Sequence, residues 1–330
     1  MMNRRNFLKA SALGAAAGLL DVKIGLAQDG PVRLDPALKA YAVAPGVSGN
    51  ASSVGSDTLN NLMTYWAESF KKFYPNVNIQ IEGKGSGTAP PALTAGTAQF
   101  GPMSRPMKST EEDAFQAKYG YKPTQIRTAV DALGVFVNKD NPIPSLALEQ
   151  VDAIFSKARR RGAAKQVITW GELGLTGEWA DKPISLYGRN SASGTYGFFK
   201  EHVLKNGDFR DEVKEQPGSA AVVQAVATDR FAIGYSGIGY ATSGVRAVAL
   251  AEKAGVTPMA ANAENAYSGE YPLARFLFVY INRAPGKALD PLVREFMRMI
   301  LSKEGQEVVV KDGYYPILAS AANEDLKKVD

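Results

Sequence analysis

Hydrophobic positions along the chain switch repeatedly between the spacing of strands and that of helices. Alternating apolar residues predict a strand over 77–82, and an unbroken apolar run predicts a buried strand over 129–138. From Leu59 the apolar residues follow helical spacing until Pro75 ends the pattern. We expect further strands and helices at 184–187, 197–204, 219–229, 231–235, 246–250, 276–282 and 291–300. This alternation predicts an α/β fold with open sheets.

One stretch between a predicted strand and a predicted helix has the composition of an anion site. It reads Arg189-Asn-Ser-Ala-Ser-Gly-Thr195. Small hydroxyl residues and glycine at a helix start direct backbone N–H groups to one point, where the helix dipole favours negative charge. The planar guanidinium of Arg189 suits a tetrahedral oxyanion. Taken alone, the stretch is equally well explained by a hydroxyl-capped helix beside a solvated arginine.

Two other predicted helix starts repeat this composition. Gly83-Lys-Gly-Ser-Gly-Thr88 follows the strand at 77–82, and Gly55-Ser-Asp-Thr58 precedes the helix from Leu59. Three such turns are unlikely to arise by coincidence. If they converge, they form a site rich in hydrogen-bond donors and almost without acceptors.

Composition narrows the possible functions. The 330 residues are enough for two domains, and the apolar and charged contents of 45% and 22% are those of a globular protein. The absence of cysteine excludes disulfides, thiolate metal sites and cysteine nucleophiles. Of the net charge of +5, the first 27 residues hold +3, so the remainder carries only +2 and does not suggest a nucleic-acid partner. We expect the basic run Arg159–Arg161 to be a solvated loop.

The N-terminus has the features of an export signal. The paired Arg4 and Arg5 precede Phe-Leu-Lys, a short alanine-rich run over 10–20, and small residues up to Ala27. This pattern resembles a twin-arginine signal for residues 1–27, and a general secretory signal is the alternative. We therefore expect cleavage near Ala27, the twin-arginine translocase as an export partner, and a periplasmic protein. Residues 28–47 are expected to be an extended or mobile lead-in, and no other segment suggests a membrane span.

Catalytic signatures are scarce. The single histidine, His202, lies in a predicted helix beside apolar residues, where a packed histidine is expected, and no Gly-x-Ser-x-Gly elbow is found. The acidic run Glu111–Asp113 begins a predicted helix and would serve its dipole. No metal site and no cofactor motif is apparent. The inventory predicts a protein that binds an anion without transforming it.

Several stretches in order resemble the periplasmic phosphate-binding proteins of ABC-type uptake systems, which are type II periplasmic binding proteins. They span Gly55 to about Leu318 and include GSDTL, IEGKGSGT, FGPMSRPMK, VDALGVFVNKDNP, ISLYGRNSASGT, ATDRFAIGYSGIGY and YPLARFLFVYINRAP. The resemblance implies a two-lobe fold with a hinged interlobe cleft that closes on phosphate. One lobe would comprise 48–131 plus 241–330, and the other 132–240.

The resemblance also implies ligand-binding residues. From the first lobe it implies a hydroxyl and amide of Thr58, the amide of Leu59 and the hydroxyl of Ser86. From the second lobe it implies the guanidinium of Arg189 and a turn formed by Ser193, Gly194 and Thr195.

One position departs from the best-known family pattern. An aspartate that accepts the proton of hydrogen phosphate is replaced here by Ser104, followed by Arg105. Rejection of sulfate requires an acceptor, because sulfate has no proton to donate. We expect Ser104 or Asp57 to be that acceptor, and Arg105 either to join the ligand shell or to pair with a carboxylate.

The resemblance implies an exported binding protein that delivers inorganic phosphate to ABC permease subunits. An alternative is a binding protein for another tetrahedral oxyanion, such as sulfate, molybdate or arsenate. A secreted phosphoesterase on the same scaffold is a weaker alternative, because the chain has one histidine and no evident metal site. A sensory or scavenging protein without a permease is also compatible with the sequence.

Overall fold

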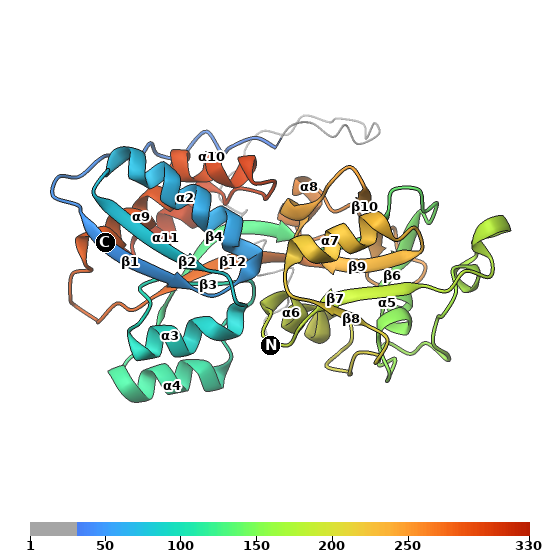
Figure 1. The fold of residues 1–330 in the computed structure, drawn as a ribbon. Helices are drawn as coiled ribbons and strands as arrows, with labels where there is room; N and C mark the ends of the chain where they lie inside the picture. Colours follow the sequence, from blue (N-terminus) through green and yellow to red (C-terminus); the bar gives the residue numbers. More distant parts are fainter. Residues whose placement is uncertain (1–31) are drawn as a thin grey trace.

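The computed structural model describes residues 32–330, which form two α/β lobes side by side (Figure 1). The predicted signal, residues 1–27, and the first residues of the lead-in lie outside the described part. Within that part no helix is long and apolar enough to cross a membrane. The predicted α/β class is confirmed.

The first lobe is built around two small sheets. Strands β3 (Gly101–Met103) and β4 (Thr124–Ala132) pair antiparallel with β12 (Ala274–Ile281), and β1 (Gly49–Val54) pairs parallel with β2 (Val77–Glu82). A bridge between Ser53 and Phe100 links β1 to the segment before β3. The helices of this lobe are α2 (Asn60–Phe73), α3 (Ala89–Ala95), α4 (Ser109–Tyr119), α9 (Pro291–Ile300), α10 (Lys303–Lys311) and α11 (Ala319–Leu326).

The second lobe contains a five-stranded sheet in the order β10-β5-β9-β7-β8. Its strands are β5 (Gly134–Asn138), β7 (Ser185–Arg189), β8 (Lys214–Gln216), β9 (Ala232–Ser236) and β10 (Val245–Ala247), and a separate pair joins β6 (Ser145–Ala147) to β11 (Ala249–Ala251). Helices α5 (Leu148–Phe155), α6 (Gly194–His202) and α7 (Ser219–Thr228) belong to this lobe, and α8 (Ala263–Ser268) contacts β4 and β12.

The strand pairing corrects one predicted boundary. Strands β10 and β11 follow residue 240, yet they hydrogen-bond to β5 and β6 of the second lobe. The predicted first-lobe segment 241–330 therefore begins too early, and residues 245–251 belong with 132–240. A three-residue strand carries no signal of its own for the sheet that it joins. The other boundary, predicted after residue 131, falls where β4 leads through Leu133 into β5.

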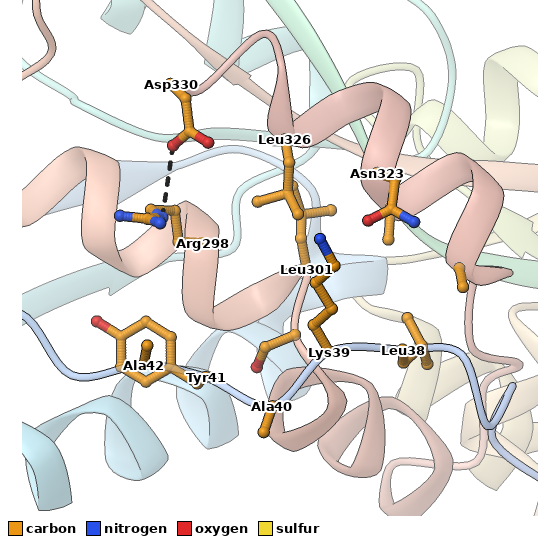
Figure 2. Close-up of a pocket in the computed structure, with 13 residues that line it drawn as sticks. Leu38, Lys39, Ala40, Tyr41, Ala42, Arg298, Leu301, Asn323, Leu326 and Asp330 are labelled. Atoms are coloured by element: carbon orange, nitrogen blue, oxygen red, sulfur yellow. Dashed lines mark ion pairs between the residues drawn. The ribbon is translucent and has the colours of Figure 1, made fainter.

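The described part of the lead-in is extended and packs on the first lobe. The Tyr41 amide donates to the Glu304 carboxylate at 2.7 Å, and the Lys39 carbonyl accepts from the Lys303 amide at 2.8 Å. Leu38 and Val47 are buried. Figure 2 shows the small cavity that this segment encloses with α9 and α11, next to the ion pair of Arg298 and Asp330.

The basic run 159–161 is not simply a solvated loop, as the sequence suggests. The Arg161 side chain is only 8% exposed. Its guanidinium donates to the carbonyls of His202 and Val203 at the end of α6. The last carbonyls of a helix lack intrahelical donors, and Arg161 hydrogen-bonds to two such carbonyls at the C-terminus of α6.

Asp312 lies in an unfavourable place for a charge, just after α10 and against the second lobe. Its Oδ2 atom is buried and has no hydrogen-bond partner among residues 32–330. The backbone oxygen of Asp312 lies 2.7 Å from the position of a Cβ built at Gly239. Burial raises the pKa of Asp312 from 3.8 to about 7.

Because the folded protein binds this proton more tightly than the unfolded chain, stability falls as the pH rises from about 4 to about 7. The Asp312→Asn variant lacks this titration. We expect it to melt several degrees above the wild type at about pH 8 and at nearly the same temperature at about pH 4. Thermal unfolding followed by circular dichroism at both pH values measures this. An equal difference in melting temperature between variant and wild type at both pH values would contradict the buried Asp312 charge as the cause.

Candidate functional site

The three glycine- and hydroxyl-rich turns of the sequence meet where the two lobes touch. The turn at 83–88 contacts the turn at 189–195, because the Gly87 amide donates to the Ala192 carbonyl at 3.0 Å. The third turn reaches the same place through Thr58, whose hydroxyl lies 2.8 Å from that of Thr195. The convergence expected from the sequence is therefore present.

Five buried hydroxyl groups gather at this point, none of them on a residue more than 2% exposed. The Ser56 hydroxyl donates to Ser104 at 3.1 Å, and the Ser86 and Ser104 hydroxyls lie 3.3 Å apart. The Ser104 and Thr195 hydroxyls lie 3.5 Å apart. We call Ser56, Thr58, Ser86, Ser104 and Thr195 the hydroxyl cluster. Each hydroxyl can both donate and accept, so the cluster can adapt its hydrogen bonds to an anion.

The start of α6 supplies further donors. Ser193 is the N-cap, and its hydroxyl accepts from the amides of Thr195 and Tyr196 at 3.2 and 3.4 Å. The first turn of this nine-residue helix points toward the other lobe. The partial positive charge at a helix N-terminus favours an anion there.

Two glycines permit the lobes to approach. A Cβ at Gly194 would lie 2.2 Å from the Ser86 hydroxyl oxygen and 2.6 Å from that of Ser104. Gly85 has a φ of 112°, and a Cβ there would lie 2.6 Å from the Ala192 carbonyl oxygen. A side chain at either position would hold the lobes apart.

Arg189 ends β7 and is 2% exposed. Its Nη1 atom donates to the Ser219 hydroxyl at 2.7 Å and lies 3.1 Å from the Asp57 carboxylate. Its Nε atom is buried and has no partner among the described residues. Burial lowers the pKa of Arg189 and the Asp57 charge opposes this, but an arginine stays protonated. A buried N–H donor on a cation thus remains available to a ligand.

A second buried arginine, Arg275 on β12, was missed in the sequence. Its guanidinium donates to both the Thr195 hydroxyl and the Ser104 carbonyl at 2.9 Å. It also donates twice to Asp131 on β4, at 2.9 and 2.8 Å. The signal available was a charged residue at the start of an otherwise apolar strand, 274–281.

The two buried arginines are each matched by an aspartate. Asp131 pairs with Arg275, and Asp57 pairs with Arg189. The other oxygen of Asp131 accepts from the Ile238 amide at 2.9 Å. The expectation of a site almost without acceptors is therefore wrong, although both oxygens of Asp131 and the Oδ2 atom of Asp57 are already engaged.

The structure shows Arg105 paired with a carboxylate, one of the two arrangements considered for it. Its fork of donors binds Glu111 twice, at 2.7 Å each. Burial acts to raise the pKa of Glu111, but the hydrogen bonds from Arg105 and the Lys108 amide lower it by more. Glu111 thus holds the Arg105 guanidinium in place. It also interacts favourably with the dipole of its own helix, which is the role that the sequence suggested. Arg105 still lies near the site, since a Cβ at Gly197 of α6 would be 3.4 Å from its Cδ.

Leu59 contributes its side chain to the core, where it is fully buried, and its amide lies 3.3 Å from the Ser56 carbonyl. The structure thus brings most of the predicted site residues together: Thr58, Ser86, Ser104, Arg189, Ser193, Gly194 and Thr195. The remaining three lie at the margin of the same site: Asp57, Leu59 and Arg105.

The chain is similar to known proteins over most of its length. The phosphate-binding protein PstS of Pseudomonas aeruginosa is 58% identical over 322 residues, 98% of this chain and 99% of that protein. The SphX protein of Synechococcus elongatus is 29% identical and covers 87% of this chain and 88% of its own. A model of the twin-arginine translocation signal matches residues 1–20, so the predicted export route is confirmed.

Solved structures show the same architecture. A Clostridium perfringens substrate-binding protein, assigned to a phosphate ABC transporter and solved with bound phosphate, superposes with a TM-score of 0.69 at 26% identity. It covers 82% of this chain and 100% of that one. A Vibrio cholerae phosphate transport receptor shares the fold, with a TM-score of 0.62 at 21% identity over 80% of this chain and 99% of that one. Because the model of the PBP superfamily domain also matches residues 41–304, the chain belongs to the periplasmic binding protein superfamily.

Proposed function

We propose that this protein captures inorganic phosphate between its lobes in the periplasm and delivers it to the permease subunits of an ABC transporter. The observation that carries the proposal is the buried, unpartnered Nε donor of Arg189, whose guanidinium lies 3.1 Å from Asp57, the residue next to Thr58 of the hydroxyl cluster. The names of the Pseudomonas and Clostridium relatives described above support phosphate as the ligand.

In this proposal the two lobes share the coordination of one anion. Thr58, Leu59, Ser86 and Ser104 contribute from the first lobe. Arg189, Ser193, Gly194 and Thr195 contribute from the second. Removing a doubly charged anion from water is costly unless each oxygen is hydrogen-bonded, so binding requires both lobes and is coupled to closure. Release then requires a partner that reopens the cleft.

Selectivity for phosphate over sulfate requires an acceptor for the phosphate proton. Both Asp131 oxygens and one Asp57 oxygen already accept hydrogen bonds. Ser104 lies within the hydroxyl cluster and uses one lone pair to accept from Ser56, so its second lone pair can accept a hydrogen bond from the phosphate O–H while its own hydrogen is donated to a neighbouring hydroxyl. We therefore place the acceptor at Ser104 and keep Arg105 outside the ligand shell, since Glu111 and the Pro106 carbonyl engage both of its Nη atoms.

We propose a binding protein rather than an enzyme. His202, the single histidine, lies at the end of α6 with its ring 4.2 Å from that of Phe198, away from the start of the helix where the hydroxyls gather. Metal-independent hydrolysis of a phosphate ester would instead support the phosphoesterase alternative.

Titration calorimetry of the mature, ligand-stripped protein tests the proposal directly. We expect one phosphate per chain, with a dissociation constant that a large excess of sulfate leaves nearly unchanged. Binding that sulfate abolishes would indicate a general oxyanion receptor. Failure to bind either anion would contradict the proposal. Molybdate and arsenate would then be the next ligands to titrate.

Closure can be tested with an alanine at Gly194. Its Cβ would collide with the Ser86 and Ser104 hydroxyls, and overpacking of about 1–3 kcal/mol corresponds to phosphate binding weakened roughly 5- to 150-fold. The matched control is Gly197→Ala on the same helix, where the added Cβ makes an ordinary contact at 3.4 Å. Equal affinities for the two variants would argue against closure at this point.

The acceptor assignment predicts different results for two variants. We expect Ser104→Ala to allow sulfate to compete with phosphate, because the acceptor is lost, and Asp57→Asn to preserve rejection of sulfate. Competition calorimetry with both anions measures this. If neither variant changes selectivity, the acceptor lies elsewhere.

A further inference from the structure

Asp57 belongs to the first lobe but bonds to groups of the second. It begins the short 3-10 helix η1 (Asp57–Leu59), and its Oδ2 atom accepts from the Ser219 amide at 2.7 Å. The same oxygen lies 3.1 Å from Nη1 of Arg189. One carboxylate therefore contacts a helix N-terminus and a buried cation across the cleft.

The N-terminus of α7 lacks a cap of its own. Its N-cap residue is Gly218, which has no side chain to accept from the free amides of the first turn. The Asp57 carboxylate takes this role from the other lobe, where the helix dipole also favours it. Glycine at 218 leaves room, because a Cβ there would be only 3.0 Å from Oδ1 of Asp57.

Further contacts hold this arrangement in place. The Tyr240 hydroxyl donates to the Asp57 carbonyl at 2.9 Å. The Ser219 hydroxyl accepts from Arg189, so the same residue that donates its amide to Asp57 also orients the guanidinium. Asp57, Ser219 and Arg189 form one closed set of contacts, which we call the latch.

We propose that Asp57 is a positioning residue that holds the lobes closed and orients Arg189 toward the ligand. The proposal rests on the proposed function and adds a control of ligand release to it. The latch joins protein groups directly, so it favours closure whether or not an anion is bound. Charge-assisted hydrogen bonds are the stronger kind, and each contributes most when the lobes exclude water. Losing the latch shifts the population toward the open form.

The absence of cysteine allows a direct measurement of closure. Nitroxide labels on Gln116→Cys in α4 and Glu201→Cys in α6 report the distance between the lobes, since both residues are exposed and lie on different lobes. We expect Asp57→Ala to increase the fraction of long distances in the ligand-stripped protein. Asp113→Ala is the matched control, because it removes an exposed carboxylate of the first lobe on α4. Identical distributions for Asp57→Ala and Asp113→Ala would overturn the proposal.

The rate of phosphate release is a second readout that a merely structural residue would not change. We expect release to be about tenfold faster in Asp57→Ala, equivalent to about 1.4 kcal/mol. Asp57→Asn keeps an oxygen for the Ser219 amide but loses the charge, so it should give an intermediate rate. If Asp57→Ala fails to fold, the release rate of Asp57→Asn is measured in its place. An unchanged rate in both variants would overturn the latch.

The two proposals fail in different ways. If the wild type does not bind phosphate, the proposed function is wrong, while the distance measurement on the ligand-stripped protein still decides whether Asp57 holds the lobes together.

Discussion

Two buried arginines control the geometry of the cleft. Arg189 and Arg275 are 2% and 5% exposed, and a buried charge is costly unless it is paired and hydrogen-bonded. Each is therefore paired with an aspartate, and these pairs link separate parts of the chain. Asp131 binds Arg275 on the neighbouring strand and the Ile238 amide beyond β9, so it joins β4 and β12 to the second lobe. The Asp57–Arg189 pair crosses between the lobes, whereas the Arg275–Asp131 pair lies within one sheet and contacts the second lobe through the Thr195 hydroxyl and the Ile238 amide.

The remaining donors give the site its chemistry. Four charged groups cancel formally, so attraction to an anion depends on donors that the aspartates leave free. These are the Nε atom of Arg189, the hydroxyl cluster and the start of α6. Such donors are fixed in place before the ligand arrives, which reduces the cost of ordering them on binding. Gly194 is essential to this arrangement because only hydrogen fits between the helix start and two serine hydroxyls.

The sequence predicts local features of this protein better than its long-range contacts. The three turns were recognisable because small hydroxyl residues, glycine and a following helix lie together in the chain. Arg275 was missed because it belongs to a buried strand, and its partner Asp131 is distant in sequence. The boundary at residue 240 was wrong for a similar reason, since short strands such as β10 reveal their sheet only through pairing. The role of Glu111 also depends on its contact with Arg105, a residue that lies before the helix of Glu111 in the chain.

A crystal structure of the mature protein with phosphate, at a resolution that shows hydrogen positions, would test the central claim most directly. We predict an anion enclosed between the lobes, with one oxygen on Nε of Arg189 and others on the hydroxyl cluster and the first amides of α6. The phosphate proton should point to Ser104. A phosphate bound outside the cleft, or inside it without contact to Arg189, would contradict the account.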